Sequence, residues 1–232
     1  MREFKTSLGI FYLADAGRVV SEIKEKPKLI LTDPPYLIGY KPWERNFLAV
    51  HGDMASNQRI VDIVIQYTKL LRPDGALYCF CSWKSVDLWK SKLEESGIKV
   101  KNIIIWKKNN WTAGDLKGQY SQQYEMILYC PMEKHTLAGR RDTDIWEFKR
   151  VSPYRRIHPV EKPVELIEYI LRKSTNPQDL VIDPFAGSGS VAVACENLKR
   201  RWVCVEIDEI IFQKAIKRIR RCSYDNPKEH KP

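Results

Sequence analysis

Short apolar runs alternate with amphipathic segments along this 232-residue chain, and the alternation limits the folds that it can adopt. Because parallel strands need long crossover connections, which are usually helical, this rhythm favours a doubly wound α/β sheet. The sequence predicts one domain over residues 1–232 with a Rossmann-like, mostly parallel sheet. Strands are expected at 28–32, 76–81, 98–106, 122–130, 180–182 and 202–207, and helices at 57–71, 83–96, 161–173, 190–198 and 209–221.

The rhythm fails between residues 131 and 160, where an irregular, exposed and positively charged segment is expected. The whole chain has 39 Lys and Arg against 29 Asp and Glu, so its formal net charge is +10. Basic loops can contact the phosphates of a nucleic acid, although a generally basic surface is the alternative. The candidates for DNA contact in this segment are Arg140, Arg141, Lys149, Arg150, Arg155 and Arg156. Compensation of a helix dipole explains the basic run Lys217–Arg221 at least as well.

Neither the cysteines nor the histidines form a metal-binding pattern. The six cysteines mostly fall in apolar stretches without paired CxxC spacing, so they are interpreted as reduced core thiols. The four histidines are scattered, and no metal site is expected. No apolar run reaches the length of a membrane span, and the N-terminus lacks an apolar signal region. A cytoplasmic protein that does not contact membranes is therefore expected.

A glycine-containing loop joins the strand at 180–182 to the following helix. Gly187 and Gly189 let the backbone approach a ligand closely, with helix N-terminal amides facing it. Glu206 ends the next strand, where a carboxylate can accept both hydroxyls of a ribose. A tight turn without a ligand and a dinucleotide-binding dehydrogenase are the alternatives; Asp183 at the strand tip is less typical of the second. The nucleoside-binding candidates are Asp183, Pro184, Phe185, Ala186, Gly187, Ser188, Gly189, Glu206 and Ile207.

Asp33-Pro34-Pro35-Tyr36 follows the strand at 28–32 and has the residue types that methylation of a base amino group needs. The lone pair of such an amine is conjugated with the ring, so acceptors must hold its hydrogens before the nitrogen can attack a methyl group. The Asp33 carboxylate and the Pro34 carbonyl can be these acceptors, and the two prolines keep the loop rigid. Tyr36 can stack on a base that is flipped out of a duplex. A stiff turn without catalytic function is the alternative.

Together the two loops resemble the permuted β group of DNA amino-methyltransferases, in which the catalytic motif precedes the cofactor loop. The resemblance covers about residues 10–215. It includes His158–Pro163, which matches the Lys-Pro motif of the family, and Glu206, which matches its ribose-binding acid. The resemblance implies an S-adenosylmethionine-dependent methyltransferase fold. It assigns catalysis to Asp33, Pro34, Pro35 and Tyr36.

The resemblance also implies roles for residues outside the two loops. Leu13–Ala16 looks like the short acidic motif that contacts the adenine of the cofactor, and Ile105–Asn109 resembles the motif beside the target base. The cofactor-binding candidates therefore also include Asp15, Asp33, Lys162 and Pro163. The DNA-binding candidates also include Lys107, Lys108 and Asn109. A short target-recognition segment is expected at about 110–158, which implies a short DNA site or help from a second subunit.

The leading functional hypothesis is site-specific methylation of the N6 amino group of adenine in double-stranded DNA. Asp33 at the first catalytic position resembles the adenine enzymes more than the Ser that is frequent in N4-cytosine enzymes. The alternatives are N4-cytosine methylation, methylation of an amino group in RNA, and a catalytically silent DNA-binding module. Double-stranded DNA, a second copy of the chain and a cognate restriction endonuclease are the partners considered.

Overall fold

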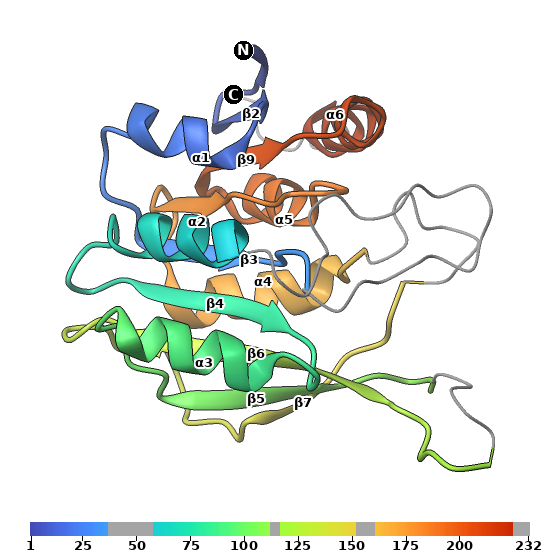
Figure 1. Ribbon diagram of the computed structural model, residues 1–232. Coiled ribbons are helices and arrows are strands. Elements are labelled where there is room, and N and C mark those ends of the chain that lie inside the picture. Colours follow the sequence, from blue (N-terminus) through green and yellow to red (C-terminus); the bar gives the residue numbers. More distant parts are fainter. Residues whose placement is uncertain (37–57, 112–116, 152–160, 225–232) are drawn as a thin grey trace.

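The computed structural model describes residues 1–36, 58–111, 117–151 and 161–224, in which helices cover both faces of one sheet (Figure 1). The strands are β1 (Arg2–Lys5), β2 (Gly9–Leu13), β3 (Leu29–Thr32), β4 (Ala76–Cys81), β5 (Asn102–Lys107), β6 (Tyr124–Pro131), β7 (Ile145–Glu147), β8 (Leu180–Asp183) and β9 (Arg201–Glu206). The helices are α1 (Ala16–Val19), α2 (Gln58–Thr68), α3 (Val86–Glu95), α4 (Val164–Ser174), α5 (Ser190–Leu198) and α6 (Glu209–Tyr224), with the short 3-10 helix η1 (Val20–Glu22).

The nine strands of the described residues are ordered β1-β2-β9-β8-β3-β4-β6-β5-β7. β1 pairs antiparallel with β2, and β6 lies antiparallel between β4 and β5, while the other pairings are parallel. The predicted mostly parallel, Rossmann-like sheet is therefore confirmed. The predicted elements are all present with boundaries shifted by a few residues, whereas β1, β2, α1 and β7 were not expected. β7 corrects the expectation that residues 131–160 are wholly irregular, because its three residues pair with β5. Three residues are too few to show the alternation of apolar and polar side chains that indicates a strand in a sequence.

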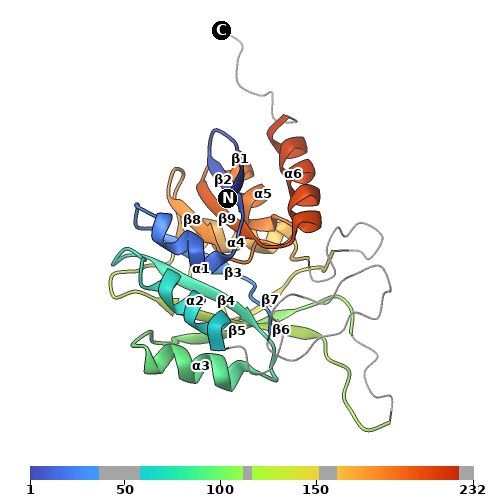
Figure 2. The same cartoon turned by 45° about the horizontal axis from the view of Figure 1, so that its top comes forward.

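The apolar strands supply side chains to two separate cores. Leu29 and Leu31 of β3 belong to the core beneath α4, α5 and α6, whereas Ile30 belongs to the core beneath α1, α2 and α3. All four residues of β3 are buried. A strand covered on both faces has no solvent side, which explains why its sequence is a continuous apolar run. Figures 1 and 2 show α1–α3 on one face of the sheet and α4–α6 on the other.

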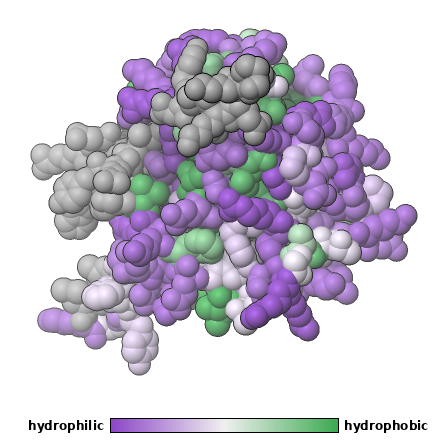
Figure 3. Space-filling model, turned by 180° about the vertical axis from the view of Figure 1, so that it is seen from behind, coloured by the Kyte–Doolittle hydropathy of each residue, from purple (hydrophilic) through white to green (hydrophobic). Residues whose placement is uncertain are grey.

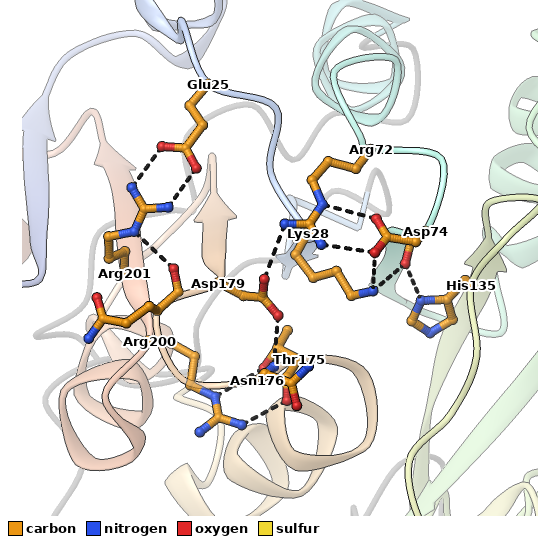
Figure 4. A network of polar contacts seen from close by, with 11 residues as sticks. Glu25, Lys28, Arg72, Asp74, His135, Thr175, Asn176, Asp179, Arg200 and Arg201 are labelled. Carbon is orange, nitrogen blue, oxygen red and sulfur yellow. Dashed lines mark hydrogen bonds and ion pairs between the residues drawn. The ribbon is translucent and has the colours of Figure 1, made fainter.

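The amino ends of four neighbouring strands are joined by a charged network (Figure 4). Arg72 donates from Nε and Nη2 to the two carboxylate oxygens of Asp74, each over 2.9 Å, and from Nη1 to Asp179 over 3.2 Å. Lys28, which precedes β3, lies 3.0 Å from Asp74 before β4. Arg201, the first residue of β9, forms a bidentate pair with Glu25. These contacts fix the relative positions of β9, β8, β3 and β4 at the edge opposite the candidate site.

The cysteines lie mostly in the interior, and one face of the surface is mostly polar (Figure 3). Five of the six cysteines, Cys79, Cys81, Cys130, Cys195 and Cys204, are buried free thiols, which confirms the assignment of most cysteines to the core. Among the described residues, each helix is too short or too polar to cross a membrane. On the face opposite to the view of Figure 1, hydrophilic side chains dominate the coloured surface and apolar residues form small, separated patches (Figure 3).

Candidate active site

β3 and β8 are adjacent parallel strands whose crossover helices lead in opposite directions along the sheet. β8 continues through α5 to β9 on one side, and β3 is followed by α2 and by β4 on the other. Such a reversal opens a crevice beyond the carboxyl ends of the two strands, where ligands bind in doubly wound folds. Asp33 directly follows β3 and Asp183 ends β8, so both predicted loops begin at this point. The Thr32 hydroxyl donates to Asp183 Oδ1 over 3.0 Å and links the two strand ends.

The glycine loop turns sharply between β8 and α5. Its start is fixed by Asp183 Oδ1, which accepts from the Phe185 amide over 3.1 Å. Gly189 has a φ of +75°, and a Cβ on it would lie 3.3 Å from Ile219 Cδ1 of α6. Both the left-handed backbone and the close approach of α6 therefore favour glycine at this position. Of the other predicted loop residues, Pro184, Ala186 and Ser188 are buried, and Gly187 is partly exposed.

Glu206 lies beside this loop at the end of β9. Its Oε2 accepts from the Gly187 amide over 2.9 Å, and its Oε1 accepts from the amides of Ile207 and Asp208, each over 2.8 Å. Burial raises the pKa of the Glu206 carboxyl, and these three amide donors partly offset the rise. The Ile207 side chain is 54% exposed and places apolar surface next to the carboxylate. A carboxylate acceptor beside an exposed apolar side chain and a glycine turn fits the ribose and the base of a nucleoside.

Asp15 is held near Glu206 by the pairing of β2 with β9. Leu13 is the register partner of Glu206, and the Ala14 amide donates to the Glu206 carbonyl over 3.0 Å. Asp15 caps α1 by accepting from the Gly17 amide, and its Oδ2 pairs with Arg59 over 2.7 Å. The predicted cofactor residues from three separate segments thus gather along the carboxyl ends of β2, β9 and β8.

The predicted catalytic loop holds a second cluster, which consists of charged groups. Lys162 Nζ forms an ion pair with Asp33 Oδ2 and donates to the Tyr36 hydroxyl over 3.1 Å. The Lys162 side chain is only 5% exposed, and its ammonium also lies 5.0 Å from the centre of the Phe80 ring. Lys162 and Pro163 are predicted to bind the cofactor, and the structure places the Lys162 ammonium on the predicted catalytic carboxylate. Pro163 forms the N-cap of α4.

Asp33 presents one unused acceptor in this cluster. Its Oδ1 is buried and has no hydrogen-bond partner among the described residues. Burial raises the pKa of the Asp33 carboxyl, and the Lys162 ammonium opposes the rise. A buried acceptor without a donor is costly for folding, so such an atom beyond the carboxyl ends of two adjacent strands favours a ligand that supplies the donor. Of the two prolines that follow in the chain, Pro34 is buried and Pro35 is partly buried.

Arg218 of α6 connects the glycine loop to the segment before α4. Its Nη1 lies 3.3 Å from the Ser188 carbonyl, 3.2 Å from the Ser190 hydroxyl and 3.0 Å from Glu161 Oε1. Ser190 in turn donates to the carbonyl of Lys162 over 2.9 Å. Arg218 therefore braces the glycine loop, a role beyond the dipole compensation considered for the run 217–221.

The predicted DNA-binding residues do not form one cluster. Lys107 is exposed and pairs with Glu147 over 2.8 Å, whereas Lys108 reaches into the site and pairs with Glu125 over 2.6 Å. Asn109 Oδ1 accepts from the Arg150 amide over 3.0 Å, which joins the end of β5 to the segment after β7. Lys149 is exposed after β7, and Arg140 and Arg141 are exposed before it. Arg155, Arg156 and His158 lie outside the described residues.

Two residues of the site, Glu125 and Arg218, are not among the site residues that the sequence predicts. Glu125 shares a strand face with Ile127 and Tyr129, which are both buried in the core beneath α4. A carboxylate in register with buried apolar residues is the signal that could have identified it. Arg218 lies on α6 between the buried residues Ala215 and Ile219, so it is likewise a charged residue among buried apolar ones.

Comparisons with known proteins agree with this geometry. A family model for DNA methylases, named N6_N4_Mtase, matches residues 28–217. The type II methyltransferase M2.DpnII of Streptococcus pneumoniae is 25% identical over an alignment of 245 positions, gaps included, which covers 89% of this chain and 87% of that protein. The DNA adenine methyltransferase YhdJ of Escherichia coli (strain K12) is 25% identical over an alignment of 258 positions, gaps included, which covers 92% of this chain and 84% of that protein.

A solved structure is similar over nearly the whole chain. The crystal structure of the M1.HpyAVI-SAM complex superposes with a TM-score of 0.73 and 29% identity, and covers 90% of this chain and 98% of that one.

Proposed function

The chain belongs to the N6/N4 DNA methylase family of S-adenosylmethionine-dependent enzymes, and from this premise we propose that it methylates the N6 amino group of adenine in double-stranded DNA. One observation carries the proposal: the buried Oδ1 of Asp33 has no donor among the described residues and lies at the start of the Asp-Pro-Pro-Tyr loop. The two hydrogens of an exocyclic amine are donors of the kind that this atom lacks.

Residues of the chain have separate tasks in the proposed reaction. Asp33 Oδ1 accepts a hydrogen bond from an N–H of the target amine. This hydrogen bond favours a pyramidal nitrogen whose lone pair can attack the methyl group. Lys162 holds the other oxygen, Oδ2, and its positive charge favours the ionised carboxylate against the effect of burial. The Tyr36 ring stacks on the flipped base, and the two prolines hold the loop in place so that it does not reorganise during the reaction.

The cofactor supplies a methyl group on a positively charged sulfonium sulfur. We assign its ribose to Glu206, its adenine to Ile207 and Asp15, and its remaining part to the glycine loop with Asp183. These assignments are supported by the partly exposed carboxylate of Glu206, the exposed side chain of Ile207 and the left-handed turn at Gly189. The exposed basic residues on either side of β7 are proposed to contact phosphates of the duplex.

Adenine is favoured over cytosine by the Asp at the first position of the catalytic loop and by the likeness to YhdJ, a DNA adenine methyltransferase. The likeness to a type II methyltransferase supports a recognition site shared with a restriction endonuclease. Long-read sequencing of DNA from cells that express the protein reports the modified base and its sequence context together. We expect N6-methyladenine at one short sequence; modification confined to cytosine would overturn the choice of base.

The nature of the polymer is tested separately. Purified protein is incubated with labelled S-adenosylmethionine and either duplex DNA or structured RNA of similar length. Label is expected in the duplex DNA, and label only in RNA would refute the proposal. A second copy of the chain is proposed to assist recognition, and sedimentation of the protein with and without a duplex measures that stoichiometry.

A further inference from the structure

Glu125 lies on β6 within the face of the sheet that packs beneath α4. Ile127 and Tyr129, its neighbours on the same strand face, are buried. The Glu125 side chain is 18% exposed. A carboxylate at such a position costs free energy unless partners compensate its desolvation, so its retention calls for specific contacts.

Three contacts occupy both carboxylate oxygens of Glu125. Oε1 pairs with Lys108 Nζ over 2.6 Å. Oε2 accepts from the Tyr36 hydroxyl over 2.8 Å and lies 3.2 Å from Lys162 Nζ. One side chain thus binds the strand end of β5, the catalytic loop and the segment before α4.

We propose that Glu125 is a positioning residue for methyl transfer: it anchors the Tyr36 ring by its hydroxyl and, with Lys108, fixes Lys162 against Asp33. The inference rests on the proposed function and adds to it a residue outside both loops. Through these contacts Glu125 fixes the ring on which the base stacks. It also keeps Lys162 on Oδ2 of Asp33, which leaves Oδ1 for the amine.

The charges of the cluster predict how each partner affects Asp33. Two carboxylates, Asp33 and Glu125, face two ammonium groups, Lys108 and Lys162. Burial of Glu125 opposes its ionisation, but the ammonium groups of Lys162 and Lys108 lower its pKa to about 2, so it remains charged at neutral pH. Its charge raises the pKa of Asp33, in the same direction as burial and against the effect of Lys162.

Other titratable groups near Asp33 act in known directions. The Tyr36 hydroxyl lowers the pKa of Asp33, and burial raises the pKa of Tyr36 well above its ordinary value. Asp183, Cys79 and Cys81 lie close enough for their own pKa values to be raised by the charge of Asp33, after the larger effect of burial. Glu125 also raises the pKa values of Tyr36 and Cys81, after the larger effect of burial, so Glu125→Gln is expected to lower both of these values together with that of Asp33. Because burial keeps the Tyr36 and Cys81 groups protonated at acidic and neutral pH, the acid limb of the profile reports Asp33.

The experiment compares Glu125→Gln and Lys108→Gln by the pH dependence of kcat at saturating cofactor and duplex DNA. Glu125→Gln is expected to lower kcat about tenfold, because Tyr36 and Lys162 lose their anchor. It removes a negative charge, so the acid limb of the profile moves to lower pH. Lys108→Gln removes a positive charge and moves that limb to higher pH. If Glu125 and Lys108 only supported the fold, the two substitutions would not displace the acid limb in opposite directions.

Two controls separate positioning from folding. Glu94→Gln removes an exposed carboxylate that pairs with Lys90 over 2.8 Å and is expected to change neither kcat nor the pH profile. The melting temperature and the Kd for S-adenosylmethionine are measured for each variant, and the Kd is expected to stay within about twofold of wild type. If Glu125→Gln does not fold, Tyr36→Phe removes only the hydroxyl that Glu125 binds, and a severalfold fall in kcat is expected.

A double-mutant cycle tests whether Glu125 acts through the Tyr36 hydroxyl. If Glu125 acts partly through the Tyr36 hydroxyl, the effects of Glu125→Gln and Tyr36→Phe are less than additive. Additive effects, or an active wild-type enzyme whose Glu125→Gln variant retains kcat and its acid limb, overturn the inference and leave the proposed function intact. A wild-type protein that transfers no methyl group to DNA overturns both.

Discussion

The Thr32 hydroxyl donates to Asp183 Oδ1 over 3.0 Å, and this hydrogen bond joins the strand of the catalytic loop to the strand of the glycine loop. Both residues are buried, and they come from adjacent parallel strands that lie 151 positions apart in the sequence. A carboxylate proposed to face the cofactor and a carboxylate proposed to face the target base are thereby held in a fixed relation.

Thr32→Val tests the importance of this hydrogen bond. The substitution keeps the shape of the side chain and leaves Asp183 with one donor fewer, so the free energy of unfolding is expected to fall by about 1.5 kcal/mol. The Kd for S-adenosylmethionine is expected to rise as well, which calorimetry measures. Thr68→Val removes a buried hydroxyl that donates to the Val64 carbonyl within α2, and this control should weaken folding without changing the Kd.

Asp183→Asn tests the burial of charge beneath the cofactor loop. Burial raises the pKa of Asp183 to about 7, while hydrogen bonds from Phe185 and Thr32 partly oppose the rise. In the unfolded chain the same carboxyl titrates near about 4, so between these values the folded protein binds the proton more tightly. The stability contributed by the protonated carboxyl is full below about pH 4 and is lost as the pH rises through 7.

Urea unfolding at several pH values checks this prediction. Relative to Asp183→Asn, the wild type is expected to lose stability on the order of a few kcal/mol as the pH rises through that window. Equal pH dependence of the two proteins would show that the pKa of Asp183 is not raised in the folded protein. The same substitution is expected to weaken cofactor binding above pH 7, since an ionised Asp183 attracts a cationic ligand.

Arg218→Gln tests the brace on the glycine loop. Loss of its contacts with Ser188 and Glu161 is expected to raise the Kd for S-adenosylmethionine about tenfold, because hydrogen bonds that involve a charged group contribute about 1.5 kcal/mol or more. At saturating cofactor, kcat should change little. Arg220→Gln, on an exposed position of the same helix, is the matched control. An unchanged Kd in Arg218→Gln would restrict Arg218 to a role in packing.

Asp74→Asn tests whether the charged network at the amino ends of the strands is separate from the active site (Figure 4). Hydrogen bonds from Arg72 hold the pKa of Asp74 well below its usual range, with a further contribution from Lys28 and with burial opposing. The stabilising effect is present above about pH 4 and is lost as the pH falls through the lowered pKa. The Asp74 side chain is 41% exposed, so solvent screening limits the expected loss at neutral pH to about 1 kcal/mol. Methyl transfer at 25 °C should be unchanged, and a fall in kcat would contradict the separation.

The parts of this fold that were predictable from sequence are those determined locally. β3 and β8 are buried on both faces, so each appears as a short apolar run that ends in an aspartate. The glycine loop was predictable for a similar reason, because a left-handed turn such as that at Gly189 admits few residue types. β7 was not predictable, since an edge strand of three residues carries no periodic pattern.

The charged cluster depends instead on contacts between distant segments. Tyr36 lies 89 positions from Glu125 and 126 from Lys162, and no local pattern indicates which carboxylate a buried lysine will bind. The resemblance to a family indicates Lys162 and Asp33, whereas the partners of Glu125 depend on the position of β6 beside β4 in the sheet. The individual roles of the site residues stay predictions until the variants above are measured.

The most direct test of the account is the identity of the nucleoside that the protein modifies. Unmethylated duplex DNA is incubated with the protein and labelled S-adenosylmethionine, digested to nucleosides and analysed by mass spectrometry, in parallel with Asp33→Ala. We predict labelled N6-methyladenine from the wild type and none from Asp33→Ala, which should still bind the cofactor. Labelled N4-methylcytosine as the sole product, or undiminished methylation by Asp33→Ala, would contradict the account.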